Sequence, residues 1–123
     1  MSMRVGLDLV RSDTVRESVL AHGEHYLNRI YTGQELEDCR GDPLRLAARF
    51  AAKEATFKVL GRTDEAISWR SIAVRRDEGG RPSIELTGAA ADLAQRRGIR
   101  SLEVSLTHEE PFAAAVVLAE LAG

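Results

Sequence analysis

The segment from Asp42 to Gly61 constrains the fold more than any other part of the chain. Asp42 and Pro43 form an N-cap followed by proline at the first helical position, and Gly61 supplies a C-terminal stop. One long helix is therefore predicted between them. Its second half, RFAAKEATFKVLG, is rich in alanine and phenylalanine, so we expect the helix to be enclosed on several sides. Glu54 and Lys58 are charged residues in this apolar setting and need an explanation.

The remaining segments predict strands and helices without a regular strand-helix-strand alternation, which indicates an α+β domain. Alternating apolar residues predict strands over Val5–Val10 and Ser101–Thr107, and a hairpin over Trp69–Arg76 and Pro82–Leu86 with its turn at Gly79-Gly80. Further helices are predicted over Thr14–Ala21, up to Ile30, over Gln34–Cys39 and over Thr87–Arg97. Periodicity alone allows Phe112–Leu121 to be a helix, but its valines and the preceding turn favour a buried strand.

Length and composition limit the class of protein. A chain of 123 residues with 44% hydrophobic residues predicts one domain, 1–123. Its net charge of -2 makes bulk nucleic acid an improbable partner. Cys39 is the only cysteine, which excludes an intrachain disulfide and a thiolate zinc site. Neither a signal peptide nor a membrane span is recognisable, so we expect no membrane partner and a cytoplasmic location.

Three residues are the first candidates for chemistry. Glu54 and Lys58 lie one helical turn apart, and Asp8 is an acid within a strand, between Leu7 and Leu9. An exposed ion pair on the helix and a solvent-facing Asp8 would explain them without any function. If the strand and the helix are in contact, the two acids instead supply hard oxygen ligands of the kind that Mg²⁺ takes together with substrate phosphates and water.

Several cationic side chains accompany these acids. Arg49 and Lys53 lie on the same predicted helix, and arginine and lysine are suitable donors to phosphate oxygens. His108 directly follows a predicted strand, where it either faces a cleft or is an ordinary turn residue. No GxxxxGK[ST] or GxGxxG loop is present, so the familiar nucleotide-binding loops are absent.

Four segments in this order resemble one known family. VGLDLV, RFAAKEATFKVLG, the GGRP turn and VSLTHEEPFAAAVV are similar, in order and spacing, to the holo-acyl-carrier-protein synthase group of 4'-phosphopantetheinyl transferases. The similarity extends over nearly the whole chain. It implies an antiparallel sheet packed against one long helix with short additional helices. It also implies transfer of the phosphopantetheine arm of coenzyme A to a serine of an apo acyl carrier protein, with release of adenosine 3',5'-bisphosphate.

The resemblance also implies roles for individual residues. Asp8 and Glu54 match Mg²⁺ ligands, Lys58 matches a partner of the transferred phosphate, and His108 matches a contact to coenzyme A. The remaining positions that match the family's cofactor cleft are Arg49, Lys53 and Pro82. Phosphoryl transfer depends on a metal and cations placed around developing charge, so these roles agree with the residue types.

A homotrimer with active sites between neighbouring subunits is a further implication of the resemblance, with the alanine and valine run near the C-terminus packed centrally. The family binds its carrier beside the first strand, where Arg11, Arg16 and Arg29 are the candidates in this chain. Thr14-Val15 departs from the family pattern in this region.

The loop after Gly61, RTDEAISW, also departs from the family pattern and is expected to bring Asp64 and Glu65 near the cleft. Two other functions stay open. One is a non-catalytic trimeric module that binds coenzyme A or a nucleotide, and the other is a small metal-dependent phosphate-ester hydrolase.

Overall fold

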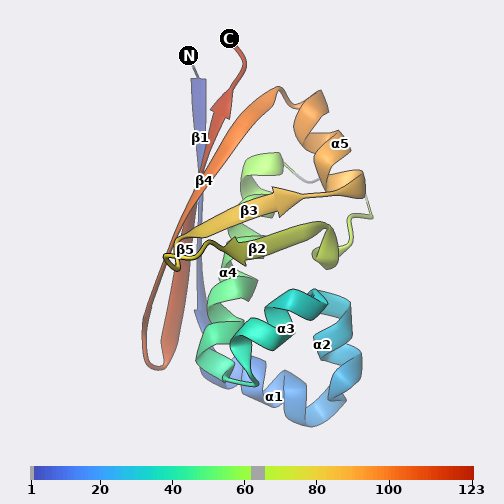
Figure 1. Cartoon of the computed structure of the whole chain (residues 1–123), viewed down its shortest axis with the longest axis vertical. Coiled ribbons are helices and arrows are strands. Elements are labelled where there is room, and N and C mark those ends of the chain that lie inside the picture. Colours follow the sequence, from blue (N-terminus) through green and yellow to red (C-terminus); the bar gives the residue numbers. More distant parts are fainter. Residues whose placement is uncertain (1, 62–65) are drawn as a thin grey trace.

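The computed structural model describes residues 2–61 and 66–123 and has an α+β architecture (Figure 1). The strands are β1 (Ser2–Arg11), β2 (Ile72–Arg76), β3 (Pro82–Leu86), β4 (Ile99–Glu109) and β5 (Phe112–Leu121). The helices are α1 (Ser12–His22), α2 (Glu24–Ile30), α3 (Gly33–Cys39), α4 (Pro43–Leu60) and α5 (Gly88–Arg96), with a 3-10 turn η1 (Trp69–Ser71). Asp64 and Glu65, and with them the predicted approach of their loop to the cleft, lie outside the described residues.

Helix α4 has the ends that the sequence predicts. The Asp42 side chain accepts a hydrogen bond from the Leu44 N–H at 2.9 Å, Pro43 occupies the first turn, and Gly61 ends the helix with a φ of 66°. Twelve of its residues are buried, which confirms that the helix is enclosed on several sides. Aromatic packing covers one side, where the Trp69 ring lies 5.0 Å from the rings of both Phe50 and Phe57.

Strands β1, β5 and β4 form an antiparallel sheet with β5 in the centre, and β2 pairs with β3 in a separate hairpin. Figure 1 shows the hairpin crossing in front of α4, the first three helices at one end of α4 and α5 near the other. The central strand confirms the predicted strand over Phe112–Leu121. Every second residue of it packs against α4: Ala113, Ala115, Val117 and Ala119. These small side chains allow the helix to lie close to the sheet.

The boundaries of two predicted strands are corrected. Trp69–Ser71 is a 3-10 turn, so the strand begins only at Ile72. At the other end, β4 continues to Glu109, which places His108 inside a strand, paired with Ala113, instead of after one. Backbone pairing with β5 extends the ladder beyond the alternating apolar residues from which the strand was predicted.

The outer face of the sheet is apolar although no described residue covers it. Met3, Val5, Leu7 and Leu9 point outward from β1 with 54% to 66% of their surface exposed. Their neighbours on β5 include Val116 opposite Leu7, which is also exposed. A contiguous apolar face of this kind marks an interaction surface.

Burial determines how reactive the only cysteine is. Cys39 is completely buried, and burial raises the pKa of its thiol to about 11. We expect a disulfide reagent at pH 8 to label the native protein at least ~100-fold more slowly than the urea-unfolded chain, because the thiolate is both scarce and inaccessible. Absorbance of the released thiolate measures both rates. Equal rates would contradict the burial of Cys39.

Candidate active site

The candidate site begins where β1 touches α4. Gly6 makes this contact possible, because a Cβ atom there would lie 2.2 Å from the carbonyl oxygen of Ala55. Two residues later, Asp8 points to the same side of the strand and is only 19% exposed. The solvent-facing position considered for Asp8 is therefore wrong. The leucines beside it face outward, and the acid faces the helix.

Lys58 connects the two elements. Its ammonium group donates to the backbone carbonyl of Leu7 at 2.6 Å and to the Asp8 carboxylate at 3.3 Å. Glu54 lies one turn earlier on α4 and is half-buried, so the fold brings all three predicted residues to one junction of strand and helix. These contacts to β1 mean that Lys58 is more than the local partner of Glu54 within one helix. Its side chain is 52% exposed, so an anion can approach it.

A cleft of about 880 Å³ opens along the same helix. Ala48 and Arg49 line it from α4, and Leu106 and His108 line it from β4. Leu106 pairs with Ala115, the same β5 residue that pairs with Asp8, so one strand separates the cleft wall from the acid. The other lining residues come from α3, the start of α4 and the hairpin: Gln34, Glu37, Asp38, Arg40, Arg45, Arg75, Arg76 and Asp77.

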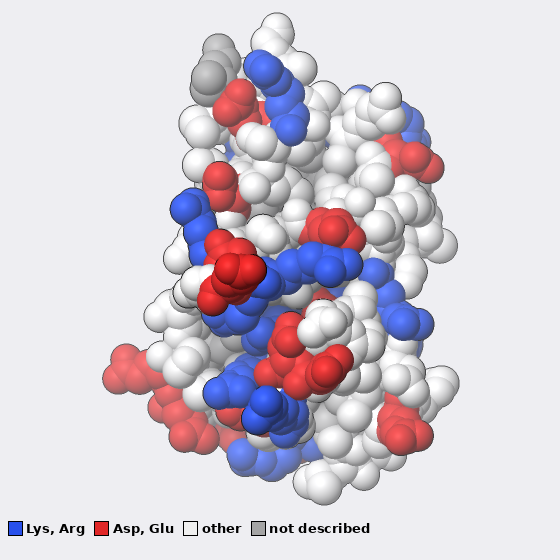
Figure 2. Space-filling view, viewed as in Figure 1, with Lys and Arg blue, Asp and Glu red and all other residues white. Residues whose placement is uncertain are grey.

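The cleft is rich in arginine. Figure 2 shows Lys and Arg side chains gathered around the hollow centre of this face, with acidic side chains among them. Arg49 is 2% exposed, and among the described residues its Nε has no hydrogen-bond partner. A buried guanidinium nitrogen without a partner favours an anionic ligand, since arginine donors match phosphate oxygens.

Two of the predicted cofactor residues lie elsewhere. Lys53 has no exposed side-chain surface and forms an ion pair with Glu35 at 2.8 Å, so it belongs to the core beneath the cleft instead of its surface. Burial lowers the pKa of Lys53, and the Glu35 carboxylate opposes this shift. Pro82 begins β3 opposite Arg76, next to the cleft wall but not among the residues that line it.

Sequence reasoning found Arg49 but missed the other arginines of the cleft and the buried Glu35. Arg45 comes from the first turns of α4, whereas Arg75 and Arg76 come from the hairpin, and no local pattern brings these elements together. Glu35 had a visible signal. Thr32 and Glu35 have the spacing of a capping box, and the structure contains both of its hydrogen bonds.

Asp8 and Glu54 are suitable ligands for Mg²⁺, because both supply hard carboxylate oxygens. The Lys58 ammonium group already lies 3.3 Å from the Asp8 carboxylate, so this carboxylate is accessible to a cation. In the part of the chain that the structure describes, no group of three or more His, Cys, Asp or Glu could hold a metal. A metal at Asp8 and Glu54 therefore has to complete its coordination with water and substrate oxygens.

The predicted carrier-binding arginines are exposed at the end of β1, on α1 and on α2. Arg11 and Arg16 both form ion pairs with Asp13, at 3.0 and 3.7 Å. Arg11 also lies 5.0 Å from the centre of the Phe112 ring. Arg29 is exposed near the end of α2. No helix in the described ranges is long and apolar enough to span a membrane.

Comparison with known proteins identifies the class to which this fold and site belong. The profile of the 4'-phosphopantetheinyl transferase superfamily matches residues 4–117, and the chain therefore belongs to this superfamily. Holo-[acyl-carrier-protein] synthase of Halothermothrix orenii is 38% identical over 119 residues, covering 94% of this chain and 95% of that protein. The synthase of the same name from Anaeromyxobacter dehalogenans is 40% identical over 129 residues, covering 100% of this chain and 99% of that protein.

A solved structure agrees with the fold. The crystal structure of Helicobacter pylori holo-[acyl-carrier-protein] synthase in complex with coenzyme A matches with a TM-score of 0.86 and 26% identity, covering 95% of this chain and 100% of that one. This similarity bears out the predicted α+β transferase-like fold with antiparallel strands and helices.

Proposed function

We propose that this protein transfers the 4'-phosphopantetheine group of coenzyme A to a serine of an apo acyl carrier protein, as the names of its relatives indicate. The observation that carries the proposal is the junction of Asp8, Glu54 and Lys58 beside a cleft rich in arginine. The cleft has the donors for the nucleotide phosphates, and the junction has the groups for the phosphorus that is transferred.

In this reaction the serine oxygen forms a bond to the phosphorus that carries the pantetheine arm, and the proton of the serine hydroxyl is released to water. The bond from that phosphorus to the bridging oxygen breaks, and adenosine 3',5'-bisphosphate leaves. Asp8 and Glu54 would hold Mg²⁺, which supplies positive charge to the pyrophosphate oxygens. Lys58, half-exposed and held by the Leu7 carbonyl, orients its ammonium group toward the same oxygens. Arg49 and His108 hold the nucleotide in the cleft.

The arrangement favours a transferase over a non-catalytic binding module. A module that only binds coenzyme A needs the cleft but not two acids and a lysine brought together from β1 and α4. Intact mass spectrometry tests the proposal directly with apo carrier protein, coenzyme A and Mg²⁺. The carrier should gain one phosphopantetheine, and adenosine 3',5'-bisphosphate should appear in equal amount. Excess EDTA should stop both. An unchanged carrier mass with Mg²⁺ present would contradict the proposal.

The proposal includes a homotrimer. The apolar outer face formed by Met3, Val5, Leu7 and Leu9 on β1 with Val116 and Leu118 on β5 is exposed in the single chain, which supports an interface there, and the resemblance implies three subunits around it. A cytoplasmic location, predicted from the sequence, remains part of the proposal.

Light scattering tests the interface. Leu7→Glu should reduce the mass from three times the 13.5 kDa of one chain to that of a single chain, because a carboxylate cannot be buried without a partner. Leu20→Glu is the matched control, since Leu20 is 80% exposed on α1 and away from the sheet face. A wild-type protein of single-chain mass, or equal masses for both variants, would contradict this interface.

Carrier binding completes the proposal. Acyl carrier proteins are acidic, and this chain has a net charge of -2, so positive residues must act locally to attract them. Arg11 ends β1, three residues after Asp8, and Arg16 follows on α1. Both side chains are exposed near the candidate site, which supports them as the docking site. Arg29 adds a third exposed cation on α2.

A further inference from the structure

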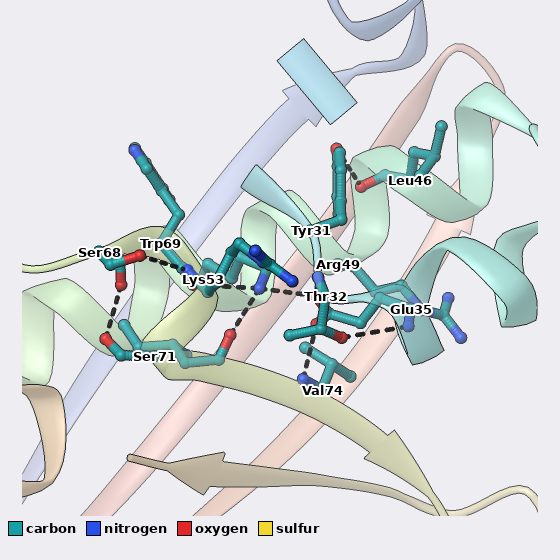
Figure 3. A network of polar contacts seen from close by, with 12 residues as sticks. Tyr31, Thr32, Glu35, Leu46, Arg49, Lys53, Ser68, Trp69, Ser71 and Val74 are labelled. Carbon is teal, nitrogen blue, oxygen red and sulfur yellow. Dashed lines mark hydrogen bonds and ion pairs between the residues drawn. The ribbon is translucent and has the colours of Figure 1, made fainter. Parts of the chain in front are cut away.

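Glu35 and Lys53 form a completely buried ion pair behind the wall of the cleft (Figure 3). Neither side chain has exposed surface, and the Oε1–Nζ distance is 2.8 Å. Two charges removed from water in this way lose their hydration, so a buried pair by itself is weak evidence for stability. What distinguishes this pair is the set of backbone groups that it joins.

Glu35 connects α3 to β2. Its Oε1 accepts the N–H of Thr32 at 2.8 Å, which closes the capping box at the start of α3. Its Oε2 accepts the N–H of Val74 in β2 at 2.7 Å. One carboxylate thus fixes the helix end and the strand relative to each other.

Lys53 connects α4 to the same region. Besides Glu35, its ammonium group donates to the carbonyl oxygens of Trp69 at 3.2 Å and Ile72 at 2.5 Å. All three hydrogens of the ammonium group therefore have acceptors, on α3, η1 and the start of β2. Figure 3 shows Lys53 between these partners, with Glu35 and Val74 on one side and Trp69 on the other.

Three of the elements joined by the pair, α3, α4 and β2, also contribute walls of the cleft. Gln34 and Arg75 line the cleft and are the chain neighbours of Glu35 and Val74, respectively. Arg49 lines it one helical turn before Lys53 on α4. The spacing between the arginines of α4 and those of β2 is therefore set by contacts that pass through this buried pair.

We propose that Glu35 and Lys53 are positioning residues for the nucleotide end of coenzyme A: they hold the three walls of the cleft at the spacing that lets Arg49 and Arg75 act on the same ligand. The proposal rests on the assignment of the cleft to coenzyme A. Directional hydrogen bonds fix such a spacing, whereas apolar side chains of the same volume would allow the walls to slide.

Calorimetric titration with adenosine 3',5'-bisphosphate isolates this role, because the ligand contains the nucleotide end without the pantetheine arm. The double variant Glu35→Gln/Lys53→Met removes both charges, so no unpaired charge is left in the core. Its Kd should rise about 10- to 100-fold, with binding stoichiometry unchanged. The KM for coenzyme A should rise with it, while the KM for the carrier stays constant.

The matched control is Glu120→Gln/Arg100→Met, which removes a partly exposed ion pair far from the cleft. It should bind like the wild type. A purely structural role for the buried pair predicts a lower stoichiometry at unchanged Kd, because fewer molecules are folded, and that result would overturn the proposal.

If the double variant does not fold, the Kd of Glu35→Asp tests the proposal instead. This variant keeps both charges but is too short to hold Thr32 and Val74 together, so an unchanged Kd would again overturn the proposal.

Two further outcomes separate this inference from the proposed function. Arg49→Leu should weaken bisphosphate binding if the cleft is the nucleotide site. No binding by the wild type, or no effect of Arg49→Leu, would contradict the assignment of the cleft and overturn the inference with it. If Arg49→Leu weakens binding but the double variant binds like the wild type, the cleft remains the nucleotide site and only the positioning role of Glu35 and Lys53 is overturned.

Discussion

Asp8→Asn and Glu54→Gln are each expected to reduce the rate of phosphopantetheine transfer by at least about 10²-fold, because each removes one of the two carboxylates proposed to hold Mg²⁺ at the reacting phosphate. Both substitutions keep the side-chain shape, and Asp8 lies in a partly exposed position, so the melting temperature should change little. Intact mass of the carrier, followed over time at saturating Mg²⁺, measures the rate.

Asp92→Asn and Glu24→Gln are controls for these variants, since they make the same chemical changes at exposed positions on α5 and α2. They should transfer at the wild-type rate. Near-wild-type rates for Asp8→Asn and Glu54→Gln at saturating Mg²⁺ would contradict joint metal binding. Loss of activity in only one of them would show that a single acid holds the metal.

Gly6→Ala should damage both stability and activity. The added Cβ would lie 2.2 Å from the Ala55 carbonyl oxygen and 3.2 Å from Val59, and neither the helix backbone nor β1, which is paired with β5 along its length, can move away freely. Overpacking of this kind costs ~1–3 kcal/mol of unfolding free energy. Because β1 would shift from α4, Asp8 would also move relative to Glu54, and transfer should fall by about 10-fold or more. Thermal melting and the mass assay measure the two effects.

Gly33→Ala is the matched control for this substitution. Gly33 begins α3, nothing lies within 4 Å of the added Cβ, and alanine suits a helix better than glycine. Its melting temperature should equal or exceed that of the wild type. If Gly6→Ala also melted and reacted like the wild type, close contact between β1 and α4 would not position the site.

Local signals explain why much of the fold could be predicted. The limits of α4 depend on Asp42, Pro43 and Gly61, which act within one helical turn of each end, so the sequence alone contains the necessary information. The strand over Phe112–Leu121 was a harder prediction, because a continuous apolar run fits a buried helix equally well. The structure shows that this segment is the central strand of the sheet, as its β-branched valines suggested.

The orientation of β1 could not be predicted in the same way. An isolated strand with Leu7 and Leu9 on one face suggests that this face is buried, yet Gly6 and Asp8 face α4. The close approach of Gly6 to Ala55 decides the orientation, and that contact depends on residues 49 positions apart in the chain. The apolar face is then left exposed in the single chain.

The residues of the candidate site also fall into two groups: those that local patterns in the sequence indicate and those that only the folded chain brings to the site. Glu54 and Lys58 were recognisable from their spacing on one helix, and Asp8 and His108 from their places in and after predicted strands. The resemblance to the transferase family then gave these four residues their roles. Lys53 was expected at the cleft surface, but its neighbours on α3 and β2 enclose it, and no pattern within α4 indicates this. Arg75 and Arg76 enter the cleft only because the hairpin folds back across α4.

Titration of Mn²⁺, followed by its electron paramagnetic resonance signal, tests most directly whether Asp8 and Glu54 together hold the metal. Mn²⁺ takes the same oxygen ligands as Mg²⁺ and loses signal intensity when bound. With coenzyme A present, the wild type should bind one Mn²⁺ per chain, and Asp8→Asn and Glu54→Gln should each weaken binding by at least ~10-fold, while Asp92→Asn has no effect. Unchanged Mn²⁺ affinity in both site variants would contradict the account.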